Sequence, residues 1–288
     1  MESDSIYILR EAKRRFRKPA LLWSMGKDST TLLWLCRKAF FGSVPMPVLH
    51  LDTGFKFPEM YAFRDKLAAA WDLDLFVIRD SATTARPEQG RFACCMARKT
   101  DALKMAIKEH GFDALIVGIR RDEHGIRNKE RYFSPRRDGK WAVSGDVAIK
   151  MRDPDPRSAG VDAAHVSGDA PVTSEQDAEL AGWHLFATDF TGADHVRIHP
   201  LLHWTELDVW RYVRDEGIPV APLYFAVGGK RYRSLGCMPC THPVASTAST
   251  VDEIITELER TRTAERDGRS QDKEEAHMME RLRSLGYL

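Results

Sequence analysis

The chain has 288 residues, enough for one large α/β domain or for one domain with a small appendage. Its 43 lysine and arginine side chains nearly cancel its 42 aspartates and glutamates, and the formal net charge of +1 argues against bulk attraction to nucleic acid or membrane. No run of eighteen apolar residues occurs and the first residues lack an apolar run of signal-peptide length, so we expect a cytoplasmic protein with no membrane partner.

Helical and strand-like patterns alternate along the first 122 residues. An amphipathic pattern predicts a helix at 5–17, which Pro19 ends. Four apolar runs of strand length follow at 20–24, 45–54, 74–80 and 113–122. Helical patterns separate them at 28–40, 57–73 and 99–111. The alternation predicts an α/β fold with a doubly wound, mostly parallel sheet and helices on both faces.

Polar residues follow three of the predicted strands. They lie at Ser24–Lys27, Asp52–Gly54 and Arg120–Asp122. Ligands of such sheets bind at the carboxyl ends of the strands, so these motifs fall where a binding crevice is expected.

The composition changes near residue 134. The segment 134–195 is rich in Gly, Pro, Asp and Ser and has little periodicity, which is typical of a flexible insertion or of a lid over a nucleotide. A short strand and a helix with Thr205 as N-cap are predicted within 196–217. A charged, periodic pattern predicts a helical C-terminal extension. The proposed division is a nucleotide-binding domain at 1–133 and 196–245, the insertion at 134–195 and the tail at 246–288.

A candidate phosphate-binding loop connects the first predicted strand to its helix. It reads Ser24-Met25-Gly26-Lys27-Asp28-Ser29. Glycine lets the backbone approach an anion closely, and the start of the helix offers free N–H groups and the positive end of its dipole. Lys27 adds a positive charge. The Walker spacing is absent, and the alternative is an ordinary turn that carries Gly and Lys.

This loop resembles the pyrophosphate loop of the PP-loop ATP pyrophosphatase superfamily, whose usual form is S-G-G-K-D-S. Met25 replaces the first glycine, as in the small subunits of heterodimeric bacterial sulfate adenylyltransferases. Other stretches resemble those subunits in the same order, among them VLHLDTGFKFPEMYAFRD, GIRRDEHGIRNKER, HPLLHWTELDVWRYV, IPVAPLY, RYRSLGC and TRTAERDGR. The resemblance implies an adenine nucleotide α-hydrolase-like fold and cleavage of ATP between its α- and β-phosphates.

The resemblance also implies roles for individual residues. The loop Ser24–Ser29 would bind the pyrophosphate leaving group, and Asp28 and Asp52 would face Mg²⁺ or the ribose. The proposed catalytic cations are Lys27, Arg120, Arg121 and Arg127, with Asp122 and Arg131 completing the ATP site. A solvated charge run is the alternative for this basic stretch. His199, His203 and Trp204 are weaker candidates.

Four of the five cysteines depart from that subunit pattern. CCMARK (94–99) and GCMPCTHPV (236–244) resemble the iron–sulfur adenylyl-sulfate reductases of the same superfamily. Four thiolates, from Cys94, Cys95, Cys237 and Cys240, suit a [4Fe–4S] cluster or a tetrahedral zinc ion. The choice of iron rests on the resemblance, and coincidental buried cysteines are the alternative.

A complete reductase of this kind is not expected. Those reductases use a nucleophilic cysteine near the C-terminus, whereas this chain ends in RLRSLGYL. The fifth cysteine, Cys36, lies in an apolar stretch and is expected to pack in the core.

Three functions compete at this point. The first is transfer of AMP from ATP to sulfate with release of pyrophosphate, which in the family it resembles requires a GTPase large subunit. The second is an iron–sulfur PP-loop enzyme that activates an acceptor such as DNA or RNA for sulfur transfer, or a reductase-like protein without the catalytic cysteine; nucleic acid would be a partner only here. The third is a nucleotide-sensing subunit. We rank sulfate adenylyl transfer first and expect Lys27→Ala to abolish ATP turnover and leave the fold intact.

Overall fold

The computed structural model describes residues 1–123, 127, 130–137, 140–141, 190, 192–261 and 265–268. Most of the predicted insertion at 134–195 and much of the predicted tail at 246–288 lie outside these residues, so the proposed domain division stays a prediction, although residues 134–137, 140–141 and 195 of the insertion belong to strands of the central sheet.

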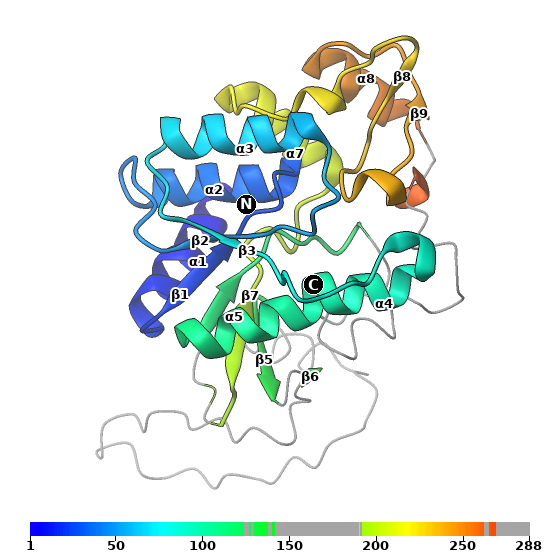
Figure 1. The fold of residues 1–288 in the computed structure, drawn as a ribbon. Coiled ribbons are helices and arrows are strands. Elements are labelled where there is room, and N and C mark those ends of the chain that lie inside the picture. The colour runs from blue at the N-terminus through cyan, green and yellow to red at the C-terminus, as the bar shows by residue number, and fades with distance from the viewer. Residues whose placement is uncertain are drawn as a thin grey trace, which may run out of the picture.

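A seven-stranded sheet forms the centre of the molecule, in the order β3-β2-β1-β4-β7-β5-β6 (Figure 1). Five neighbouring strands run parallel: β3 (Leu75–Ile78), β2 (Val48–Leu51), β1 (Pro19–Leu22), β4 (Ala114–Ile116) and β7 (His195–Ile198). At one edge β5 (Phe133–Arg137) and β6 (Lys140–Trp141) are antiparallel additions. A separate two-stranded ribbon pairs β8 (Lys230–Arg231) with β9 (Val244–Ala245).

Helices cover both faces of this sheet. Those that the structure describes are α1 (Glu2–Arg15), α2 (Lys27–Ala39), α3 (Pro58–Ala70), α4 (Arg91–Cys95), α5 (Ala102–His110), α7 (Glu206–Glu216) and α8 (Val251–Arg260). A π-helical turn, Met96–Asp101, joins α4 to α5. Figure 1 shows α5 on one side of the sheet and the layer containing α1 and α2 on the other.

The apolar side chains of the strands alternate between two cores, as strand geometry requires. In β1, Ala20 and Leu22 pack with Leu103 of α5, whereas Leu21 packs with Leu32 of α2. All five side chains are buried. Burial on both faces explains why β1 and β4 are short apolar runs without polar alternation.

The order of the strands places a binding crevice. After β1 the chain builds β2 and β3 on one side, and then returns to build β4 and β7 on the other. The loops after β1 and β4 therefore diverge at the carboxyl edge of the sheet, the position where open α/β sheets bind ligands.

The structure confirms the predicted doubly wound α/β fold. Most elements differ from the predicted runs by a few residues at their ends. The first helix ends at Arg15, because Phe16 is extended with φ −102° and ψ 143°. The fourth strand ends at Ile116, and the rest of its run leaves the ladder to reach the cavity and ion pairs described below. None of the helices in the described parts of the chain combines the length and the apolar character that crossing a membrane requires.

Candidate functional site

A cavity of about 180 Å³ lies at the carboxyl ends of β1, β2 and β4. Its apolar wall comes from the strands and the residues directly after them: Leu22, Trp23, Leu49, Leu51, Val117, Gly118 and Ile119. Its polar wall is made of Ser24, Gly26, Lys27, Asp28, Ser29, Lys56, Lys99, Glu123, Arg127, Tyr224, Glu265 and Arg266. One end of the cavity thus suits a flat apolar group and the other suits an anion.

The predicted phosphate loop forms the junction between these two walls. The Ser29 hydroxyl lies 3.1 Å from the Ser24 hydroxyl, donates to the Gly26 carbonyl at 3.1 Å, and accepts from the Ser24 backbone N–H at 3.2 Å. The Lys27 backbone N–H donates to the Tyr224 hydroxyl at 2.8 Å. Burial raises the pKa of Tyr224 to about 12, so this hydroxyl keeps its proton. The first turn of α2 is therefore held by partners on its own loop and by one distant tyrosine.

Met25 explains why glycine is usual at its position in such loops. Its φ is +61°, in the left-handed region that side chains disfavour. Its side chain is fully buried in the core on the α1–α2 side of the sheet. Core packing of that side chain thus offsets backbone strain on the order of 1 kcal/mol.

Gly118 brings the end of β4 against the start of α2. A Cβ atom at this position would lie 3.1 Å from Ser29 N and Cα and 3.2 Å from the Asp28 carbonyl carbon. All three are backbone atoms, so no side-chain rotation relieves the contact. Only glycine allows β4 and the phosphate loop to approach this closely.

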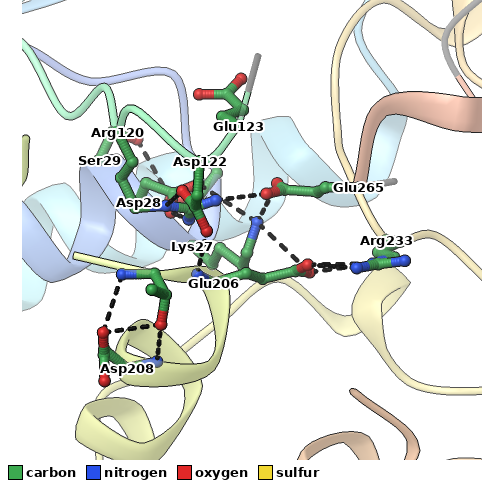
Figure 2. A network of polar contacts seen from close by, with 12 residues as sticks. Lys27, Asp28, Ser29, Arg120, Asp122, Glu123, Glu206, Asp208, Arg233 and Glu265 are labelled. Carbon is green, nitrogen blue, oxygen red and sulfur yellow. Dashed lines mark hydrogen bonds and ion pairs between the residues drawn. The ribbon is translucent and has the colours of Figure 1, made fainter. Parts of the chain in front are cut away.

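Lys27 and Arg120 lie at the centre of a buried ion network (Figure 2). Their side chains are 1% and 0% exposed. The Lys27 ammonium pairs with Glu265, with Asp28 at 3.3 Å and with Glu206 at 4.0 Å. The Arg120 guanidinium pairs with the same Glu265 and Asp28. Two carboxylates therefore bridge the two cations.

These contacts shift the protonation equilibria of the network. Burial would lower the pKa of Lys27, but Asp28 and Glu265 outweigh it and raise that pKa above its usual value. Burial would raise the pKa of Glu265, but Arg120 and Lys27 outweigh it and hold that pKa well below its usual value. Both groups are therefore charged at neutral pH.

The network continues on both sides of this centre. Arg233 pairs with Glu206 at 2.6 Å, and the Arg120 Nε donates to Asp122 at 3.0 Å. Beside it, Glu123 accepts from Arg127 and, at 2.9 Å, from Arg266. The cations are Lys27, Arg120, Arg127, Arg233 and Arg266, and the carboxylates are Asp28, Asp122, Glu123, Glu206 and Glu265. The equal numbers give the network a formal charge of zero when all ten groups are ionised, although burial raises the pKa of Asp28 and of Glu206.

Some of the predicted site residues point elsewhere. Asp52 accepts from the Gly54 N–H at 2.8 Å and from the Tyr61 hydroxyl at 2.7 Å, and it is not among the residues that line the cavity. Asp122 accepts from the Glu206 N–H at 2.7 Å and so caps the start of α7. These carboxylates are used to hold local structure.

The arginines after β4 also separate. Only Arg127 of the predicted four lines the cavity, while Arg120 lies behind it in the ion network. Arg121 donates to the Glu130 carbonyl at 2.8 Å and contacts His203 at 2.6 Å. The Arg131 carbonyl contacts His199 Nδ1 at 2.7 Å. Burial lowers the pKa of His199 to about 4, which fits a neutral structural histidine.

The four clustered cysteines lie close to one another beside the cavity. Burial, together with the neighbouring thiols of Cys95 and Cys237, raises the pKa of the Cys94 thiol to about 11. Burial and the same two neighbours raise the pKa of Cys240. The Cys237 sulfur lies 3.2 Å from the Thr53 hydroxyl. In the part of the chain that the structure describes, no three His, Cys, Asp or Glu side chains form a group that would hold a metal ion.

Sequence reasoning missed several residues that line or complete the site. They are Lys56, Lys99, Glu206, Tyr224, Glu265 and Arg266. Glu265 and Arg266 come from a 3₁₀ turn at 265–268, more than 140 residues beyond the end of β4. The only sequence signal for these two residues is their place in the TRTAERDGR stretch, because no periodicity or spacing links them to the phosphate loop.

Comparison with known proteins identifies the family. Residues 18–243 match the phosphoadenosine phosphosulfate reductase domain. Sulfate adenylyltransferase subunit 2 of Azospirillum brasilense is 40% identical over 100% of this chain and 96% of its own length. The subunit 2 of Myxococcus xanthus is 38% identical over 100% of this chain and 95% of its own.

Solved structures agree on the fold. FMN adenylyltransferase of Candida glabrata in complex with FAD and pyrophosphate superimposes with a TM-score of 0.53 at 15% identity, over 84% of this chain and 63% of that one. The same enzyme with ATP gives a TM-score of 0.52 at 16% identity, over 84% and 62%. The chain therefore belongs to the phosphoadenosine phosphosulfate reductase domain family, and within it to the sulfate adenylyltransferase subunit 2 group of nucleotidyltransferases.

Proposed function

We propose that this chain transfers AMP from ATP to sulfate. A sulfate oxygen attacks the α-phosphorus, the bond between that phosphorus and the bridging oxygen to the β-phosphate breaks, and pyrophosphate leaves with the bonding electrons. The observation that carries this proposal is identity of 36–40% to sulfate adenylyltransferase subunits 2 along the whole chain.

The cavity supports a division of labour for this reaction. Its apolar wall, with Leu22, Leu49 and Val117, suits the adenine ring. The phosphate loop suits the pyrophosphate leaving group, because the first turn of α2 and the Ser24 and Ser29 hydroxyls face the cavity. Catalysis by such a site depends on positioning and on neutralising charge in the transition state.

Sulfate would then bind near the remaining cations of the polar wall. Lys56, Lys99 and Arg127 line the cavity, and none of them belongs to the phosphate loop. Arg127 has the planar donor fork that suits a tetrahedral anion. Arg127 now forms an ion pair with Glu123. It can bind sulfate only when that pair breaks or when a bound cation neutralises Glu123.

A magnesium ion is part of this proposal. The ion network beside the cavity has a formal charge of zero, so a triphosphate would bring more negative charge next to Asp28, Glu123 and Glu265 than Lys56 and Lys99 of the cavity wall offset. A divalent cation bound there with the nucleotide would compensate that charge. Asp28 and Glu123 line the cavity and have the oxygen donors that magnesium prefers.

A second subunit is expected because forming the sulfate–phosphate anhydride is energetically uphill. The relatives are named as one subunit of their enzyme. The sequence contains no Walker motif of its own. We therefore propose a GTPase partner that supplies the driving force.

Isotope exchange between pyrophosphate and ATP tests the acceptor. Purified chain, with its partner co-expressed, is incubated with ATP and labelled pyrophosphate, with and without sulfate. Exchange that requires sulfate is the expected result. ATP turnover that sulfate does not change, but that a thiolation acceptor stimulates, would replace the proposal with the sulfur-transfer alternative.

The four cysteines support that alternative and a cofactor proposal. All four cysteines are buried, and Cys95 and Cys237 help to raise the thiol pKa of both Cys94 and Cys240. Both of their segments border the cavity, one through Lys99 and the other through Gly236. Four thiolates are a donor set for a [4Fe–4S] cluster or for zinc. Although these thiols do not form a metal-holding group in their present positions, we propose Cys94, Cys95, Cys237 and Cys240 as the ligands and derive no catalytic step from the bound group.

Metal analysis tests the cofactor. Iron, zinc and acid-labile sulfide are measured in anaerobically purified protein and in a Cys237→Ser/Cys240→Ser variant. Iron with matching sulfide, lost in the variant, supports a cluster, and zinc alone supports a zinc site. Protein without metal under anaerobic handling would overturn the assignment.

A further inference from the structure

We propose that Glu265 is a positioning residue that fastens the C-terminal segment 265–268 to the phosphate loop, so that Arg266 becomes part of the wall of the nucleotide cavity. The proposal rests on the ATP-binding function proposed above and extends it to a residue 238 positions away from Lys27.

The contact is made by one carboxylate and two cations from different elements. One Glu265 oxygen accepts from the Lys27 ammonium at the start of α2, and the other accepts from the Arg120 guanidinium after β4 (Figure 2). Each oxygen therefore holds a different wall of the crevice. A carboxylate placed in this way ties the segment to both sides of the site at once.

Burial separates this contact from ordinary surface ion pairs. The side chains of Glu265, Lys27 and Arg120 are 5%, 1% and 0% exposed. Surface pairs of this kind contribute little, but removing one member of a buried pair leaves an uncompensated charge. The described part of the chain offers a comparison in Glu259 of α8, which pairs with Arg211 at 2.8 Å while both side chains are almost half exposed.

The neighbouring residue links the tether to the cavity. Arg266 lines the cavity and donates to Glu123 at 2.9 Å, and Glu123 also pairs with Arg127. Arg266 itself is 7% exposed. Because the two residues are adjacent in sequence, the position of Arg266 depends on where Glu265 is fixed.

The arrangement also changes the role of Lys27. Its ammonium is enclosed by Glu265, Asp28 and Glu206, so its charge is already shared among carboxylates. Lys27 then supports the phosphate site by holding the C-terminal segment in place. The cation that the segment presents to the cavity is Arg266.

A double-mutant cycle tests the proposal. ATP affinity is measured by calorimetry for wild type, Glu265→Gln, Arg266→Ala and the double variant, with Glu259→Gln as matched control. Loss of a hydrogen bond to a charged group corresponds to roughly a tenfold weaker Kd, which we expect for Glu265→Gln and not for Glu259→Gln. In the Arg266→Ala background Glu265→Gln should have no further effect on Kd, because its influence acts through Arg266.

Limited trypsin digestion gives a readout that does not depend on ATP. Cleavage after Arg266 should be slow in wild type and in Glu259→Gln, and about tenfold faster in Glu265→Gln, because local opening exposes that bond. Thermal melts of each variant confirm that the proteins are folded at the assay temperature.

Three results would overturn the proposal. Tighter ATP binding by Glu265→Gln would mean that the carboxylate competes with phosphate and would overturn the proposal, as would additive effects in the cycle or unchanged cleavage. Absence of ATP binding by wild type would refute the proposed function instead, and the digestion would still test the tether.

Discussion

Replacing Lys27 by methionine tests whether the buried ion network stabilises the fold. The change keeps the length of the side chain and removes its charge. In the structure the ammonium is 1% exposed and neutralises Asp28 and Glu265, with Glu206 at 4.0 Å. Without it, Arg120 alone faces the two bridging carboxylates. Breaking a buried pair in this way destabilises a protein by about 3–5 kcal/mol.

The measurement is the free energy of unfolding from urea titrations followed by tryptophan fluorescence. Lys38→Met is the control, since Lys38 pairs with Glu2 at 2.9 Å and Glu216 at 2.8 Å but is 31% exposed. Pairs nearer the surface contribute about 0–1 kcal/mol. A Lys27→Met variant that loses no more stability than Lys38→Met would refute the reasoning. The buried ion pairs therefore predict a loss of stability where sequence reasoning expected an intact fold, and the titration decides between the two.

The pH dependence of the same variant gives an independent check. In wild type the pKa of Glu265 lies below its usual 4.5, because Arg120 and Lys27 outweigh burial. The contribution of the ionised Glu265 carboxylate to the free energy of unfolding is therefore complete above pH 4.5 and is lost as the pH falls below that value. Burial already raises the pKa of Asp28 in wild type, so removing Lys27, one of the two cations that oppose burial, favours protonation of that carboxylate further. The stability gap between wild type and Lys27→Met should narrow from pH 7 to pH 5, and a constant gap would argue against the network.

Three further substitutions test the phosphate loop. Gly118→Ala should lower the free energy of unfolding by about 1–3 kcal/mol and weaken ATP binding, because the new Cβ meets the Ser29 backbone at 3.1 Å. Gly26→Ala should lower the free energy of unfolding less in urea titrations, since its Cβ meets Ser24 Oγ at 3.4 Å. Tyr224→Phe should cost about 1–3 kcal/mol in the same titrations, because the Lys27 N–H loses its buried acceptor at 2.8 Å; an unchanged midpoint would show that the hydroxyl is dispensable.

Local sequence was sufficient for much of the fold and for one half of the site. The apolar runs and helical patterns up to residue 122 predicted the doubly wound sheet, because burial on both faces leaves a clear pattern in each strand. The phosphate loop was recognised because its residues are consecutive. Of that loop, Ser24 and the run from Gly26 to Ser29 line the cavity, as expected for a motif at the end of β1.

Other predicted residues lie after β4, as the sequence indicated, but make contacts that the sequence did not predict. Arg121 follows β4 as predicted, but its side chain contacts the Glu130 carbonyl and His203, and Arg131 meets His199 through its backbone carbonyl. A strand's end fixes where a loop begins, and side-chain packing decides which way each arginine points. Sequence spacing contains no information on that second step.

The sequence by itself determined the alternation of strands and helices up to residue 122, the family and the phosphate loop, since each of these is encoded by neighbouring residues. Only the tertiary structure decided that Lys27 and Arg120 are bridged by Glu265 and that Arg266 lines the same cavity. The physical reason is that a buried charge requires a partner wherever the chain can supply one. The partner here comes from a turn far along the chain, and only the folded sheet brings it beside the loop.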